Sequence, residues 1–83
     1  MNYRDAVERT QADLLKRLRE IDADERFHYP SANVVINAPL ALIQLGMETQ
    51  ARTIQETLQL LGYDGPELQI RSGPRAALAG EGK

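Results

Sequence analysis

The first part of the chain carries one apolar stripe at helical spacing. From Tyr3 to Ile21, apolar or small residues recur three and four positions apart, which is the period of one face of an α-helix. The stripe consists of Tyr3, Val7, Thr10, Leu14, Leu18 and Ile21. Charged side chains occupy most of the positions between them, and Asn2 precedes the stripe as a residue that commonly caps a helix. We therefore predict a helix over about residues 3–21.

A second helix is predicted over about residues 39–61, with a signal at each end. Asn37 or Ala38 can cap it, Pro39 suits its first turn, and Gly62 suits the left-handed position after its last turn. Its main stripe is Leu40, Ile43, Met47, Ala51, Ile54, Leu58 and Leu61. This stripe can pack against the first helix, so the two helices are predicted to form an antiparallel hairpin.

The first half of the second helix carries more apolar side chains than a single core needs. Leu42 and Leu45 lie off the main stripe beside Gly46, and Thr49 continues the same surface. A helix that serves one core has a single apolar stripe, so the surplus favours contact with a partner chain. We predict an oligomer interface at Leu42, Leu45, Gly46 and Thr49.

Two short segments favour extended structure. Residues 33–36 contain the β-branched run Val34-Val35-Ile36, and residues 67–71 alternate polar and apolar side chains in the manner of a half-buried strand. The two segments can pair with each other, pair with a second subunit, or remain extended arms on a helical hairpin. We expect a mainly α fold with a possible minor β element, as one domain over residues 1–74 with a flexible tail at 75–83.

Composition narrows the ways in which so small a chain can be stabilised. The 83 residues include no Cys, no Trp, one Phe and one His. Small domains have a thin margin of stability and often rely on disulfides, a metal ion or a partner subunit. Disulfides are excluded because the chain has no Cys, and a metal site is disfavoured because it has only one His. A homo-oligomer is therefore predicted, most simply a dimer.

The charge and the absence of long apolar runs bear on location and partners. A net charge of −2 and an isoelectric point near 5.3 disfavour binding to nucleic-acid phosphates. No apolar run approaches the roughly 18 residues of a membrane span, and the first residues do not resemble a signal peptide. We expect a cytoplasmic protein without membrane contact.

The loop Phe27-His28-Tyr29-Pro30 is the segment richest in functional chemistry. Its two aromatic rings and its imidazole could contact a nucleotide or another anion, or Phe27 and Tyr29 could simply plug the end of the helix pair. The plug is the favoured interpretation, because loops that close helical hairpins need apolar contacts. The loop remains the candidate ligand or partner site.

Catalytic and metal chemistry find little support. Nucleophilic catalysis at His28 would require Ser31 or Ser72, the only serines in the chain. An acidic turn at residues 22–25 fails the calcium-loop pattern, because positions six and twelve hold Phe27 and Asn33 in place of Gly and Glu. We predict no enzyme activity, no metal site and no cofactor.

The sequence therefore leaves two functional hypotheses. The first is a non-enzymatic interaction protein, a small helical homo-oligomer that acts as an adaptor, regulator or inhibitor of another protein. The second is a module that binds a nucleotide or another anion between subunits at the Phe27–Pro30 loop.

Overall fold

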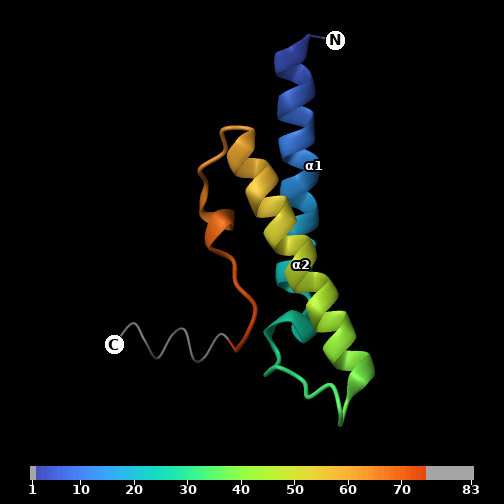
Figure 1. Cartoon of the computed structure of the whole chain (residues 1–83). Helices are drawn as coiled ribbons and strands as arrows, with labels where there is room; N and C mark the ends of the chain where they lie inside the picture. Colours follow the sequence, from blue (N-terminus) through green and yellow to red (C-terminus); the bar gives the residue numbers. More distant parts are fainter. Residues whose placement is uncertain (1, 75–83) are drawn as a thin grey trace, which may run out of the picture.

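The structure is a computed structural model, and it describes residues 2–74. Its elements are α1 (Tyr3–Ala23), the short 3₁₀ helix η1 (Glu25–His28), α2 (Ala38–Leu60) and the 3₁₀ helix η2 (Pro66–Gln69). In Figure 1, α1 runs from the N-terminus along the molecule and α2 returns across it, with residues 61–74 beside them. The prediction of a mainly helical chain with two long helices is confirmed.

The ends of both helices are closed by the residues that the sequence indicated. The Asn2 side chain accepts a hydrogen bond from the Asp5 amide at 2.8 Å, and Asn37 caps α2 by accepting from the Leu40 amide at 3.3 Å. After α2, Gly62 adopts a positive φ of 86°, and the Tyr63 amide donates to the Leu58 carbonyl at 2.9 Å. This is the glycine-dependent helix ending that satisfies the last carbonyl groups.

The core lies where the second half of α1 meets α2 and η1. Its buried apolar side chains are Leu18, Ile21, Phe27, Met47, Ala51, Ile54 and Leu58. The first turns of α1 project beyond the end of α2 (Figure 1), so Tyr3 remains 84% exposed although it continues the apolar stripe. The part of α1 that packs against α2 is therefore shorter than its apolar stripe.

Gln44 is the one polar residue of α2 among the buried side chains of the described region. Its Oε1 accepts from the Ala32 amide at 2.8 Å, and its Nε2 donates to the carbonyl oxygens of Arg26 and Pro30, each at 3.2 Å. A single side chain thus binds three backbone groups of the loop between α1 and α2. Because buried polar backbone groups need partners, this bonding holds the loop against the helix.

The predicted short strand at residues 33–36 is wrong, because these residues form a turn. The Asn33 carbonyl accepts from the amides of Ile36 at 3.1 Å and Asn37 at 2.7 Å, while the Asn33 side chain accepts from the Val35 amide at 2.8 Å. Asparagine commonly closes such turns by bonding to the backbone two residues on. The turn therefore satisfies locally the groups that a strand would have paired elsewhere.

The predicted strand at residues 67–71 is also wrong, because Pro66–Gln69 form η2. Gln55 of α2 donates to the carbonyl oxygens of Glu67 at 3.2 Å and Ile70 at 2.8 Å. Leu68 and Ile70 pack against the core, as their alternation suggested, but they do so from an irregular segment. No β element is present in residues 2–74, and the predicted tail at 75–83 lies outside the described residues.

Glu67 joins the C-terminal segment to α1. Its carboxylate accepts from the Tyr63 hydroxyl, and Arg19 Nη2 contacts its Oε2 at 2.6 Å. The hydrogen bond from Tyr63, followed by that from Arg19, lowers the pKa of Glu67 from 4.5 to about 2. The charged carboxylate is therefore the form that this arrangement favours.

We predict that Gln44→Ala lowers the free energy of unfolding by roughly 1–3 kcal/mol, because it leaves loop backbone groups without their partner. Gln50→Ala is the matched control. Gln50 is also in α2 but binds the exposed Arg17 at 2.7 Å, so its loss should change stability by less than about 0.5 kcal/mol. Urea unfolding of the three proteins measures the difference, and equal effects of the two variants would contradict the role given to Gln44.

A second prediction concerns acid stability. Because the folded-state pKa of Glu67 is about 2 and its usual value is 4.5, its stabilising contribution is complete above pH 4.5 and is lost as the pH falls toward 2. The gap in melting temperature between the native protein and Glu67→Gln should shrink across that window. Both proteins keep Asp24, whose pKa the hydrogen bonds from Arg26 also lower to about 2, so its titration cancels in the comparison. A gap that stays constant with pH would contradict the assignment.

Candidate functional site

The surface of α2 divides into sides of different chemistry. One side packs in the core. Three charged residues spaced four apart, Glu48, Arg52 and Glu56, form a second row, which we call the charged row. They share one line along the helix because residues four apart are neighbours on a helix surface. These are the only charged residues of α2, and Glu56 lies on the same row of the helix as Leu45, because eleven residues correspond to about three turns.

This remaining side is the outer face, defined by the exposed residues Leu42, Leu45, Gly46, Thr49, Thr53 and Leu60. Leu42 is 63% exposed, Leu45 58% and Leu60 86%. Leu42 and Leu60 point in the same direction, since the 18 residues between them correspond to about five turns at 3.6 residues each. The face is therefore a continuous, largely uncharged strip with leucine at both ends.

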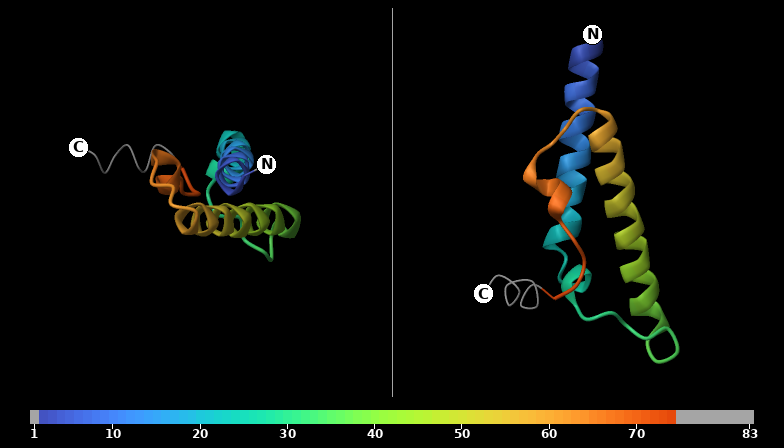
Figure 2. Two further views of the ribbon diagram at one scale, coloured as in Figure 1. Left: turned by 90° about the horizontal axis from the view of Figure 1, so that it is seen from above. Right: turned by 60° about the vertical axis from the view of Figure 1, so that its left-hand side comes forward.

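No other helix of the described residues packs on the outer face of α2. Figure 2 (left) shows α1 and residues 61–74 on the same side of that helix. The four predicted interface residues, Leu42, Leu45, Gly46 and Thr49, are all exposed and lie together here. Thr53 and Leu60 belong to the same surface, and the 3.6-residue periodicity of the helix identifies both.

A second exposed apolar cluster, the turn tip, consists of Val34, Val35 and Ile36. These side chains are 62%, 88% and 83% exposed. They lie in the loop before α2, at the end of the molecule away from the N-terminus (Figure 1). Three consecutive β-branched residues beside a turn-forming asparagine were a sequence signal for this cluster, but the same residues also suit a strand.

The side chains of the candidate loop Phe27–Pro30 are divided. Phe27 is buried, whereas His28 and Tyr29 line a pocket of about 520 Å³ together with Asp22, Ala23 and Glu25. Phe27 is 3% exposed and belongs to the core, with its ring edge-on to that of His28 at a centroid distance of 5.1 Å. Tyr29 is 43% exposed, and its hydroxyl donates to Glu25 at 3.4 Å. In this conformation the Phe27 ring cannot stack on a ligand, as it already fills the space under η1.

His28 is bonded through both ring nitrogens. Nδ1 lies 3.0 Å from the Gly73 carbonyl oxygen, and Nε2 lies 2.9 Å from both the carbonyl and the carboxylate oxygen of Asp22. All three partners are oxygen atoms that accept hydrogen bonds. The Gly73 amide also donates to the Phe27 carbonyl at 3.0 Å. The imidazole thus ties the end of α1 to the C-terminal segment.

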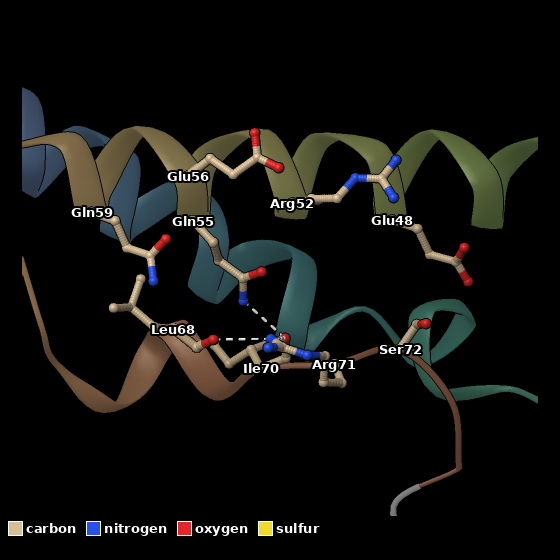
Figure 3. Close-up of a pocket in the computed structure, with 9 residues that line it drawn as sticks. All are labelled: Glu48, Arg52, Gln55, Glu56, Gln59, Leu68, Ile70, Arg71 and Ser72. Carbon is tan, nitrogen blue, oxygen red and sulfur yellow. Dashed lines mark hydrogen bonds between the residues drawn. The ribbon is translucent and has the colours of Figure 1, made fainter.

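A groove of about 420 Å³ lies between α2 and residues 68–72 (Figure 3). One wall is the charged row, in which acid, base and acid alternate. On the other wall the Arg71 guanidinium donates to the carbonyl oxygens of Leu68 and Ile70 at 2.9 and 2.8 Å. His28 does not line the groove, so Ser72 has no imidazole beside it there. The groove therefore does not bring Ser72 and His28 together.

Residues 2–74 contain neither a candidate metal site nor a membrane-spanning helix. No group of three or more His, Cys, Asp or Glu side chains in residues 2–74 could hold a metal ion. No helix in that region is long and apolar enough to cross a membrane.

Comparison of the chain with protein-family models, with curated proteins and with solved structures finds no match. The outer face of α2 is therefore assessed on its own chemistry.

We predict that His28→Ala destabilises the fold by roughly 1–3 kcal/mol and speeds hydrogen exchange at the Gly73 amide, because the bonds that hold this segment are lost. Tyr29→Ala is the control, since its exposed side chain makes one long hydrogen bond and its loss should have little effect on either measurement. Unchanged exchange at Gly73 in His28→Ala would show that the imidazole does not hold the segment.

Proposed function

We propose that this protein is a non-enzymatic protein–protein interaction module that self-associates through the outer face of α2. The proposed unit is an antiparallel helical hairpin. Two contacts between the helices support this direction: Gln11 donates to the Leu61 carbonyl at 2.9 Å, and Arg17, further along α1, donates to Gln50, further back on α2.

The observation that carries the proposal is the exposure of three leucines on the outer face of α2. A single exposed leucine is ordinary on a protein surface. Leu42, Leu45 and Leu60 instead share one strip with glycine and threonine, a pattern typical of interaction surfaces. Burying such a leucine fully contributes roughly 1.5–3 kcal/mol relative to leaving it in water. Association of two copies removes these side chains from water in both.

The role of the assembly is proposed to be that of an adaptor, regulator or inhibitor of another protein. The turn tip supports this second contact, because Val34, Val35 and Ile36 form a separate exposed apolar cluster at one end of the molecule. No catalytic group needs to be invoked for such a role, since binding alone can block or recruit a partner.

We predict that Leu42→Asp and Leu45→Asp each convert the native assembly to monomer, because a carboxylate buried in an apolar interface has no partner. Light scattering across a concentration series should give about twice 9.3 kDa, or 18.6 kDa, for a native dimer and 9.3 kDa for both variants. Gln59→Asp is the matched control: it adds the same charge to the groove side of α2 and should leave the dimer intact. Circular dichroism checks that every variant keeps its helices. A native protein that stays at 9.3 kDa throughout would overturn the proposal.

A further inference from the structure

The imidazole of His28 lies between the end of α1 and the last described residues of the chain. Its Nδ1 is 3.0 Å from the carbonyl oxygen of Gly73, and its Nε2 is 2.9 Å from the carbonyl and from the carboxylate of Asp22. The His28 side chain is 12% exposed. Water therefore has little access to the ring and does not easily replace a partner that the ring loses.

A ring that carries two protons is the form that can donate on both sides. A neutral imidazole has one N–H donor, and its other nitrogen carries a lone pair. That lone pair would face an oxygen lone pair at 2.9 or 3.0 Å, which is a repulsive contact. Because a carboxylate is a stronger acceptor than a peptide carbonyl, the neutral ring keeps its proton on Nε2, toward Asp22. The contact that fails is then the one between Nδ1 and Gly73.

We propose that His28 is a pH-dependent latch for residues 71–74: the charged ring holds them against η1 and the end of α1, and the neutral ring releases them. Histidine ordinarily gains or loses its proton between about pH 5 and 8. The closed form binds one proton more than the open form, so a rise in pH favours the open form. The latch does not depend on the self-association proposed above, because none of its residues belongs to the outer face of α2.

The ionisable groups around the ring leave this direction unchanged. Asp22 contacts the ring from α1, and Glu25 of η1 lines the same pocket. Tyr29 also lines it and donates its hydroxyl to Glu25, while Arg26 of η1 is outside the lining and pairs with Asp24 at 2.6 Å. The C-terminal segment contributes a backbone carbonyl. Carboxylic acids ordinarily ionise near about pH 4 and tyrosine near about pH 10, so histidine is the group that titrates between about pH 5 and 8.

The release is confined to the end of the segment. Gln55 of α2 donates to the Ile70 carbonyl at 2.8 Å, and its amide does not titrate. The residues before position 71 are therefore held at both ends of this pH range, whereas residues 71–74 depend on His28. Ser72 lines the groove beside α2, so opening of the latch moves one end of a groove wall. The latch thus couples pH to the shape of that groove.

Amide hydrogen exchange measured by NMR tests the latch, because the Gly73 amide donates to the Phe27 carbonyl at 3.0 Å when the segment is in place. Each rate is divided by that of an unfolded chain at the same pH, which removes the direct effect of pH on exchange. Protection at Gly73 should fall about tenfold or more from about pH 5.5 to about pH 8, as a hydrogen bond from a charged group is lost. The Ile70 amide, which donates to the Glu67 carbonyl at 3.2 Å in the same segment, is the matched control and should keep its protection.

Two variants assign the effect to the imidazole. His28→Gln has no group that titrates at this position, so the difference in Gly73 protection between the two pH values should disappear. Asp22→Asn removes the charged acceptor but keeps the ring, so the fall in Gly73 protection should move to lower pH. Circular dichroism checks that both variants fold, and Asp22→Asn keeps a readout if His28→Gln does not.

The outcomes separate a latch from a general loosening of the fold. A fall in protection at Gly73 alone, abolished by His28→Gln, supports the latch. Unchanged protection of Gly73 in the native protein would overturn it, because the neutral ring would then hold the segment equally well. An equal fall at Ile70 would overturn it in favour of general loosening. A fall at Gly73 that persists in His28→Gln, or that stays at the same pH in Asp22→Asn, would overturn it by assigning the pH dependence to another group.

Discussion

The structure depends on hydrogen bonds between glutamine side chains and the backbone of irregular segments. A segment that packs on a helix pair buries some of its own backbone N–H and C=O groups. If these groups lack hydrogen-bond partners, their desolvation costs more free energy than the buried apolar surface contributes. Gln44 binds three groups of the loop before α2, Gln55 binds two carbonyls after it, and Gln11 binds the carbonyl at the end of α2. Long amides suit this role because each offers both donors and an acceptor. Irregular segments as well as helices therefore shield the small apolar core from water.

These bonds also determine which side of α2 stays uncovered. Gln44 and Gln55 are eleven residues apart, about three turns, so they lie on one row of the helix. Both irregular segments are therefore anchored at that row, although in Figure 2 (left) the loop before α2 then passes to the side of α2 away from α1. No other helix of residues 2–74 packs against the opposite side. The exposure of Leu42 and Leu60 thus follows from the positions of two amides that lie away from the outer face.

The sequence predicted the features whose causes are local. Asn2, Pro39 and Gly62 mark helix ends through bonds within a few residues, and the apolar spacing of α1 and α2 needs only the helical period. The two predicted strands failed because other structures show the same patterns. Leu68 and Ile70 alternate toward the core, but Pro66 starts a 3₁₀ helix. The role of Gln55 was not predictable, since its acceptors lie 12 and 15 residues away.

The solvent-facing sides of α1 and α2 differ in composition, and this difference bears on the role of the outer face. Where α1 faces water it is charged, with acids and bases at most positions outside its apolar stripe. Where α2 faces water opposite the core it carries leucine, glycine, threonine and one glutamate, Glu56. Both helices are subject to the same demand for solubility, so solvent exposure alone does not account for the difference. The self-association proposed above removes this side of α2 from water and so accounts for its leucines.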